Sequence, residues 1–154
     1  MLDFEALGLS STYTRRLVTV GLVREPGLEP GHRLKSAAEL YANLRPLADL
    51  DREVFVAIHI DHKTRMVGVH VISLGSIAAS LVHPREVFKA AILTNAHALI
   101  VVHNHPSGDP TPSREDREIT ERLKSSGDIL GIPLFDHVVI ATDGFRSFAD
   151  AGML

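Results

Sequence analysis

The sequence predicts an α/β protein: a single compact domain with a mixed, mostly antiparallel central sheet flanked by helices. Segments with helical period alternate along the chain with short apolar segments rich in β-branched residues. Two pairs of these apolar segments are joined by turns too short for a crossover, so each pair is expected to form an antiparallel hairpin. The length of 154 residues suits one domain with its own core.

Residues 1–35 are expected to form an N-terminal arm with one strand. The segment Tyr13–Val23 is rich in β-branched residues, and two Pro-Gly turn signals follow it within residues 25–31. A strand here could pair at a sheet edge, either in its own domain or in a second copy of the chain. A homodimer is therefore one expectation.

Residues 36–154 are expected to fold as the domain proper. Ser36 and Glu39 form a capping box that predicts a short helix over 36–45. An apolar strand over 53–60 and a returning strand over 66–74 form the first hairpin. The remaining elements are expected at these positions: a helix from His83-Pro84 to about Asn95, a strand over 97–102, a helix over 113–126 with Gly127 at its end, a strand over 134–141, a turn at Asp143-Gly144 and a returning strand over 145–148. The strand over 97–102 is almost continuously apolar, which indicates burial on both faces and a central place in the sheet.

The composition excludes several classes of function. The absence of cysteine rules out disulfides, thiolate zinc sites and cysteine nucleophiles, so any zinc ion must be held by histidine and carboxylate. Sixteen Lys and Arg residues against nineteen Asp and Glu residues give a net charge of -3, which lacks the basic balance of many nucleic-acid-binding proteins. No apolar run approaches the ~20 residues of a membrane span, and the N-terminus lacks the features of a signal peptide. A soluble cytoplasmic protein without a membrane partner is expected.

The segment from His103 to Asp116 gives the strongest indication of chemistry. His103 and His105 lie two apart at the end of the predicted central strand, so their side chains project to one side. Asp116, in the first turn of the next helix, can return to meet them. Two imidazoles and a carboxylate can bind zinc at about 2.0–2.1 Å and leave the fourth position open for water, as in catalytic sites. Such a water has a pKa near ~7, and a carboxylate outside the ligand set would then act as general base.

Purely structural explanations exist for the same residues. Ser113 and Asp116 resemble a capping box, so Asp116 could serve only to cap its helix. The histidines could be ordinary loop residues in a rigid, proline-rich loop. Two enzyme classes are excluded: the residues of the HNH nuclease motif are dispersed over a ββα unit, and zinc nucleobase deaminases need a Pro-Cys-x-x-Cys segment that a chain without cysteine lacks.

The spacing of the motif resembles a known family. His103-x-His105, seven residues, Ser113, two residues and Asp116 match the JAMM motif of the MPN/JAB-domain metalloproteases. Three longer tracts resemble the RadC-like branch of that family: Ser80–Phe88, His103–Ser113, and Asp136–Ile140 followed by Asp143-Gly144. The resemblance covers residues 36–154 and implies an MPN/JAB-like fold, similar in architecture to cytidine deaminases. It also implies a Zn²⁺ site with His103, His105 and Asp116 as ligands, and Ser113 as a donor that stabilises the oxyanion.

The resemblance requires a glutamate as general base at the start of the first hairpin strand. Glu53 matches this position. Glu39 is a weaker candidate because its capping box already explains it, and the alternative for Glu53 is a solvated charge at a strand end. His83 and Glu86 are expected to cap a helix or support a ligand rather than bind metal. Asp136 and His137 could orient a ligand or simply lie at a strand edge.

The resemblance implies a zinc-dependent metallohydrolase, a metallopeptidase or isopeptidase that cleaves a peptide or isopeptide bond, with a protein, a peptide or a ubiquitin-like conjugate as substrate. One alternative is a RadC-type DNA-associated protein with a non-catalytic metal site, and another is a non-catalytic MPN interaction module. Full-length RadC proteins resemble a helix-hairpin-helix DNA-binding segment joined to this domain. Residues 1–35 show no such segment and no basic patch, so a nucleic-acid partner is not expected.

Overall fold

The computed structural model describes residues 31, 33–75 and 82–154. Two expectations fall on residues outside these ranges: the strand over Tyr13–Val23, and the first two residues of the tract Ser80–Phe88. Within the described ranges, no helix is long and apolar enough to cross a membrane.

Five strands form one mixed sheet in the order β2-β1-β3-β4-β5. The strands are β1 (Glu53–Ile60), β2 (Met66–Gly75), β3 (Ala98–Asn104), β4 (Leu134–Ala141) and β5 (Gly144–Ser147). Of the neighbouring pairs, β3 and β4 are parallel and the other three are antiparallel. The predicted mixed, mostly antiparallel sheet with two hairpins is therefore confirmed.

Strand β3 lies in the centre of the sheet, as its apolar run predicts. Leu99 and Val101 pack into the core on one face, whereas Ala98 and Val102 pack into the core on the other. The strand is two residues longer than predicted at its end, because β4 pairs with it as far as Asn104. The first histidine of the motif is consequently a strand residue with neighbours on both sides.

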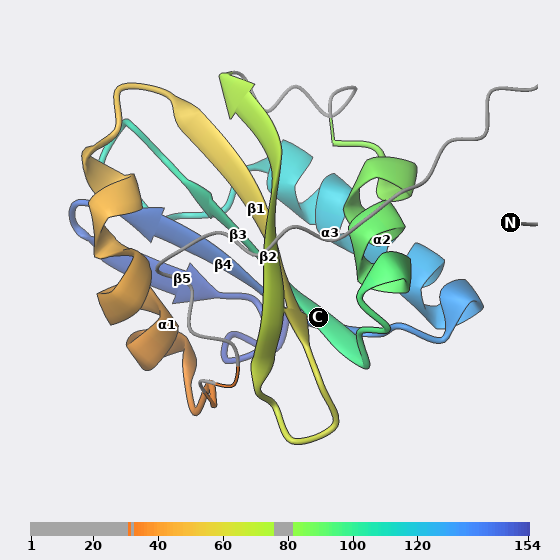
Figure 1. Cartoon of the computed structure of the whole chain (residues 1–154). Coiled ribbons are helices and arrows are strands. Elements are labelled where there is room, and N and C mark those ends of the chain that lie inside the picture. The colour runs from red at the N-terminus through yellow and green to blue at the C-terminus, as the bar shows by residue number, and fades with distance from the viewer. Residues whose placement is uncertain (1–30, 32, 76–81) are drawn as a thin grey trace, which may run out of the picture.

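Helices cover both faces of the sheet (Figure 1). Helix α1 (Ala37–Leu44) and the 3₁₀ helix η1 (Arg45–Asp49) pack on one face, where Leu40 and Ala48 join the core. Helices α2 (Pro84–Leu93) and α3 (Arg114–Leu130) pack on the other face through Phe88, Ile119 and other buried residues. Helix α3 connects β3 to β4, which is the crossover that a parallel pair of strands requires.

The predicted helix starts are confirmed by their caps. The Ser36 hydroxyl accepts a hydrogen bond from the Glu39 amide at 3.1 Å, and the Glu39 carboxylate accepts one from the Lys35 amide at 3.0 Å. At the start of α2, His83 Nδ1 accepts a hydrogen bond from the Arg85 amide at 3.1 Å. His83 is therefore a capping residue, which is one of the roles expected for it.

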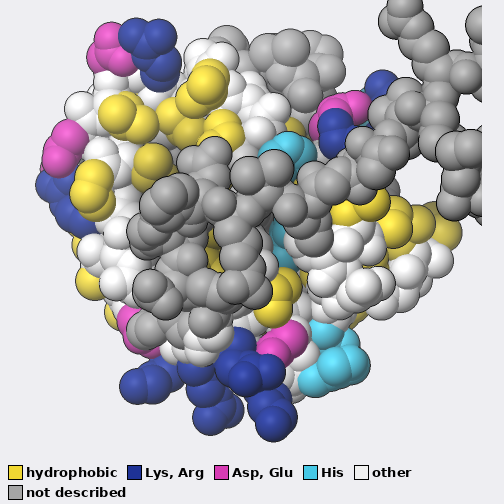
Figure 2. Space-filling view, in the orientation of Figure 1, with side chains coloured by type: hydrophobic (Ala, Val, Ile, Leu, Met, Phe, Trp, Pro, Cys, Tyr) yellow, Lys and Arg dark blue, Asp and Glu magenta, His cyan; other side chains and the backbone are white. Residues whose placement is uncertain are grey.

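A cluster of cationic side chains lies around the β1–β2 turn, at the lower end of the view in Figure 2. Arg33 pairs with Arg65 in an isolated antiparallel bridge, and Lys63 lies in the turn between the strands. Asp61 balances part of this charge through an ion pair of 2.6 Å with Arg65. The cluster is not evident from local sequence, because Arg33 pairs with Arg65 across a sequence separation of about thirty residues.

The predicted end of α3 at Gly127 is wrong. The helix continues to Leu130 and ends with Gly131, whose φ of 69° gives a left-handed cap. Gly127 is buried inside the helix, and a Cβ atom there would lie 2.6 Å from the Ile132 carbonyl oxygen and 3.3 Å from the Phe88 ring. The glycine thus permits close packing against the chain that leaves the helix, rather than ending the helix.

Replacing Gly127 with alanine is expected to destabilise the domain by about 1–3 kcal/mol, because the new methyl group overlaps backbone atoms that have little room to shift. Helix propensity alone predicts the opposite, a gain of about 1 kcal/mol. Urea unfolding monitored by circular dichroism measures the difference, with the exposed Ser125→Ala change as control. A more stable Gly127→Ala variant would show that the close approach is not rigid.

A buried histidine lies beneath the end of α2. His59 is 1% exposed, and its Nδ1 atom lies 3.1 Å from the Thr94 hydroxyl. Its Nε2 atom has no hydrogen-bond partner among the described residues. Burial, together with the nearby His70, lowers the pKa of His59 to about 4.

The free energy of unfolding is therefore expected to fall in acid. Because the pKa of His59 is lower in the folded than in the unfolded protein, its contribution is complete above pH 6.5 and is lost as the pH falls through about 4. The full effect is about 3 kcal/mol. Urea titrations between pH 7 and pH 4 measure it. His59→Leu should flatten this dependence, whereas the exposed His62→Gln change should not.

Candidate metal centre

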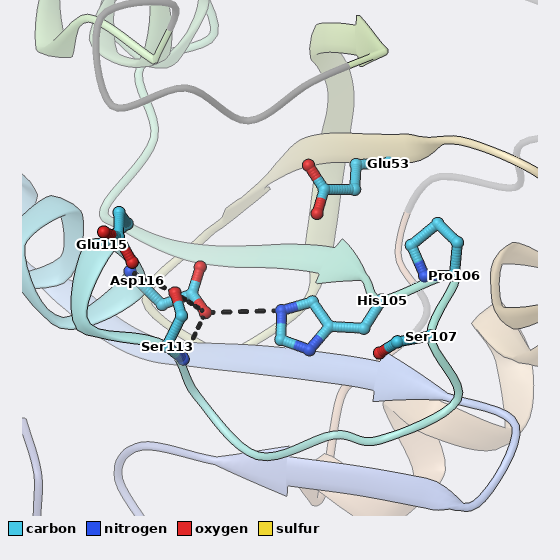
Figure 3. Close-up of a pocket in the computed structure, with 7 residues that line it drawn as sticks. All are labelled: Glu53, His105, Pro106, Ser107, Ser113, Glu115 and Asp116. Atoms are coloured by element: carbon cyan, nitrogen blue, oxygen red, sulfur yellow. Dashed lines mark hydrogen bonds and ion pairs between the residues drawn. The ribbon is translucent and has the colours of Figure 1, made fainter.

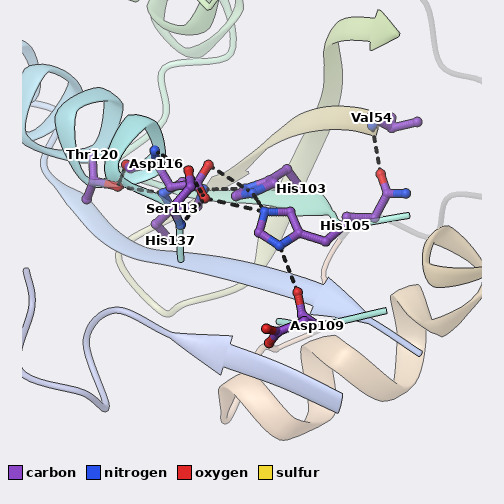
Figure 4. Close-up of polar contacts among 9 residues, drawn as sticks. Val54, His103, His105, Asp109, Ser113, Asp116, Thr120 and His137 are labelled. Carbon is purple, nitrogen blue, oxygen red and sulfur yellow. Dashed lines mark hydrogen bonds and ion pairs between the residues drawn. The ribbon is translucent and has the colours of Figure 1, made fainter. Parts of the chain in front are cut away.

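Three predicted ligand side chains meet at the end of β3 (Figure 4). His103 Nε2 lies 3.0 Å from His105 Nε2 and 3.1 Å from Asp116 Oδ1. His105 Nε2 lies 3.3 Å from Asp116 Oδ2. Ligand atoms at the zinc bonding distance of 2.0–2.1 Å in a tetrahedron are about 3.3–3.4 Å apart. The three residues therefore form a group that could bind a metal ion with little rearrangement.

The strand and the following turn hold the two histidines. His103 is fully buried, pairs with Phe55 of β1 and Val139 of β4, and stacks on the Phe55 ring with centroids 5.8 Å apart. The His105 amide continues the pairing with β4 by donating to the Ile140 carbonyl at 2.8 Å. The backbone thus keeps its strand conformation as far as His105. This places both imidazoles on one side, as predicted.

The hydrogen bond of His105 to the backbone fixes its tautomer. Its Nδ1 atom lies 2.8 Å from the Asp109 carbonyl oxygen, and a carbonyl can only accept. Nδ1 therefore donates its proton, and the lone pair of Nε2 faces the other two ligand atoms. This is the neutral form in which histidine binds a metal ion.

A buried chain of hydrogen bonds fixes the tautomer of His103. The Thr120 hydroxyl donates to the Asp116 carbonyl oxygen at 2.6 Å, so it must accept from His137 Nδ1, also at 2.6 Å. His137 Nε2 is then an acceptor for His103 Nδ1 at 2.7 Å, which leaves the lone pair of His103 Nε2 toward the site. Complete burial, with His103 nearby, keeps the pKa of His137 well below its usual value, so His137 stays neutral.

Of the two residues predicted either to orient a ligand or to lie at a strand edge, His137 contacts His103. The Asp136 carboxylate instead accepts hydrogen bonds from the Ser147 hydroxyl at 2.6 Å and the Ala149 amide at 3.0 Å. Thr120 was not predicted. The available signal was its spacing, since Thr120 lies four residues after Asp116, so the hydroxyl can reach that carbonyl within the helix.

Asp116 both caps its helix and belongs to the ligand group. Its Oδ2 atom accepts hydrogen bonds of 2.7 Å from the amide and the hydroxyl of Ser113, while the Asp116 amide donates to the Ser113 hydroxyl at 3.1 Å. The capping box considered as an alternative to metal binding is real, and it orients the carboxylate toward the histidines. The two explanations are compatible.

The electrostatics of the group favour a positive charge among the three ligand atoms. Burial alone would raise the pKa of Asp116, but hydrogen bonds from His103 and His105, which form when their Nε2 atoms carry a proton, outweigh it and hold that pKa well below the usual range. Hydrogen bonding to Asp116 raises the pKa of His105, with a smaller contribution from Glu53. A cation between these atoms is stabilised by the carboxylate.

The group opens on one side into a cleft of about 390 Å³ (Figure 3). The cleft is lined by Glu53, His105, Pro106, Ser107, Ser113, Glu115 and Asp116. Glu53 begins β1 and lies across the cleft from His105, without belonging to the ligand group. Two expected site residues, Glu53 and Ser113, thus line the cleft together with the predicted ligands His105 and Asp116.

The weaker candidates lie elsewhere. Glu39 accepts from the Lys35 amide at the start of α1. Glu86 pairs with Lys89 at 2.7 Å on α2. Neither of them lines the cleft, and neither does the cap residue His83. Glu115, on the rim, is a cleft residue that was not predicted from the sequence.

Comparison with known proteins decides the family. The family model of the RadC-like JAB domain matches residues 34–153. The chain belongs to the RadC-like JAB domain family. This membership confirms the resemblance on which the ligand assignment was based, and the sheet and helices agree with a JAB/MPN-like fold.

Relatives of this RadC-like JAB domain include several UPF0758 proteins. It is 48% identical to one from Thermotoga maritima over 122 residues, covering 79% of the chain and 55% of the relative. It is 53% identical to one from Symbiobacterium thermophilum over 108 residues, covering 70% of the chain and 46% of the relative. A third, from Methanosarcina acetivorans, is 42% identical over 127 residues, covering 82% of the chain and 56% of the relative. The chain spans about half the length of these curated relatives, whose name states no activity.

Proposed function

We propose that this RadC-like JAB domain is a zinc-dependent metallohydrolase that cleaves a peptide or isopeptide bond. One observation supports it above all: two imidazole nitrogens 3.0 Å apart lie 3.1 and 3.3 Å from the two oxygens of one carboxylate, beside a cleft that also contains a glutamate outside the ligand group. A structural metal site would need a fourth protein ligand, whereas three ligands beside an open cleft match the catalytic pattern.

The donor set supports zinc as the metal. Two imidazoles and one carboxylate are a common catalytic zinc set. Calcium and magnesium prefer sites made of oxygen ligands, which disfavours both here. When bound, zinc supplies a Lewis acid that makes water a usable nucleophile near neutral pH.

Glu53 and Ser113 have distinct roles in the proposed reaction. The Glu53 carboxylate takes a proton from the attacking water and passes it to the leaving amine. The Ser113 hydroxyl, which donates to Asp116 in the structure, turns toward the oxyanion of the tetrahedral intermediate. Asp116 loses little by this rotation, because the Ser113 amide keeps its own hydrogen bond of 2.7 Å to the same oxygen.

The cleft favours an extended protein or peptide segment as substrate, including the tail of a ubiquitin-like conjugate. It is open at the surface and lined by both polar and apolar side chains, such as Glu115 and Pro106. A flexible chain can lie along such a cleft and bring one carbonyl to the ligand group.

Metal analysis of the purified chain, followed by assays on peptide and isopeptide libraries, tests the proposal. Stoichiometric zinc and cleavage that a chelator stops and zinc restores are expected. Zinc-loaded protein that cleaves no member of either library would overturn the proposed hydrolysis. Binding of a metal other than zinc, with no zinc affinity, would overturn the choice of cofactor.

A further inference from the structure

Asn104 lies between the two histidine ligands and faces the opposite side of β3. Its side chain is fully buried. The proposed chemistry gives it no role, since it is neither a ligand nor a cleft residue. A buried primary amide must nevertheless satisfy its hydrogen-bonding groups, and its partners show what it holds in place.

The Asn104 side chain binds two backbone groups of β1. Its Oδ1 atom accepts a hydrogen bond from the Val54 amide at 2.7 Å, which is drawn at Val54 in Figure 4. Its Nδ2 atom donates to the Arg52 carbonyl oxygen at 3.0 Å. These two peptide groups flank Glu53 on either side, so one planar amide fixes the backbone of the proposed general base.

The side-chain contact begins where the backbone ladder ends. Strands β1 and β3 are paired from Ile60 with Ala98 to Phe55 with His103, and no further toward the cleft. Beyond that pair, the amide of Asn104 takes the place of backbone pairing. It therefore sets the distance between Glu53 and the strand on which both histidine ligands lie.

The extended shape of β1 does not depend on this contact. Glu53 already pairs with Gly75 of β2 on its other side, so the strand would begin at the same residue without Asn104. What the amide adds is a connection toward β3 and the ligand group. A role in placing Glu53 explains this connection better than a role in forming the strand.

We propose that Asn104 is a positioning residue, which holds Glu53 at the working distance from the metal through the peptide groups on both sides of it. This inference rests on the proposed function, in which Glu53 is the general base. An error in position of about 1 Å can lower a catalysed rate on the order of 100-fold. A side chain that makes no contact with substrate can therefore control the rate.

Kinetics of the zinc-loaded chain give the first test. Asn104→Ala is expected to lower kcat by about 10- to 100-fold with little change in KM or zinc affinity, because the ligand side chains keep their own partners. Asn104→Asp keeps the acceptor for Val54 but cannot donate to Arg52, so a smaller loss is expected. Val102→Ala, in the same strand and buried, is the control for general loosening, and its kcat should stay near that of the unchanged chain.

A spectroscopic measurement tests the inference independently of activity. With Co²⁺ bound and the glutamate carboxyl carbons labelled with ¹³C, the paramagnetic relaxation of the Glu53 signal reports its distance from the metal. A weaker effect in Asn104→Ala, with an unchanged cobalt absorption spectrum, is expected. An unchanged Glu53 signal, or a zinc affinity that falls together with kcat, would overturn the inference. If the unchanged chain cleaves no substrate, the proposed function fails, while the cobalt measurement still decides whether Asn104 places Glu53.

Discussion

Glu53→Gln is expected to remove hydrolysis while zinc stays bound. Glutamine keeps the size of the side chain but cannot accept a proton from water at neutral pH. General acid–base catalysis contributes about 10²- to 10⁴-fold, so kcat should fall by that factor. Zinc affinity should change little, because Glu53 lies outside the group of ligand atoms. Steady-state kinetics and a zinc competition assay measure the two quantities on the same preparation.

Glu118→Gln is the matched control for this change. Glu118 lies on the exposed face of α3, where it pairs with Arg114 at 2.7 Å, and it does not line the cleft. Its replacement removes the same charge without touching the proposed site. Equal activity of Glu53→Gln and the unchanged chain would exclude Glu53 as the base, and the search would move to Glu115 on the rim.

Thr120→Val is expected to weaken zinc binding by about 10- to 100-fold, the usual effect of removing a partner that orients a ligand. Valine has nearly the same shape as threonine but cannot accept the proton of His137 Nδ1. His137 can then adopt the other tautomer, in which Nε2 carries the proton. A proton on His137 Nε2 would face the proton on His103 Nδ1. This disfavours the His103 tautomer that leaves a free lone pair on His103 Nε2 for the metal.

Competition with a zinc-specific chromophore measures the affinity, and Ile119→Val is the control. Ile119 is buried beside Thr120 on the same helix, and loss of one methyl group costs about 1 kcal/mol of stability without affecting the hydrogen bonds. If zinc affinity fell by the same factor in both variants, the hydrogen bonds through His137 would have no specific role in holding the ligands.

Local spacing was enough to predict that the side chains of His103, His105 and Asp116 meet. The two-residue spacing of histidines on a strand and the position of Asp116 in the first helical turn are both properties of neighbouring residues. The proposed general base, Glu53, was chosen by its place at the start of a hairpin strand, and only through a resemblance to known proteins. Its place at the cleft results from the pairing of β1 with β3, which brings together residues fifty positions apart.

Tertiary packing accounts for what the sequence did not predict. Thr120 supports the site because α3 lies against β4 and brings its hydroxyl to His137, seventeen residues away. The sequence predicts that the helix ends at Gly127, because glycine commonly ends helices. Only the tertiary structure shows that a small residue is needed inside the helix, because the Ile132 carbonyl oxygen lies where it would overlap a Cβ atom at Gly127. The cationic cluster around the β1–β2 turn has the same kind of origin.

The ligand group connects the central strand to the next helix, since His103 lies in β3, His105 directly follows that strand and Asp116 lies in the first turn of α3. A metal ion held there would act as a cross-link in the folded chain that the unfolded chain lacks. Metal supply would then be linked to folding: a free ion at 100 times its dissociation constant adds about 2.7 kcal/mol to the free energy of unfolding. Cells short of that ion would hold a domain that is less resistant to proteolysis.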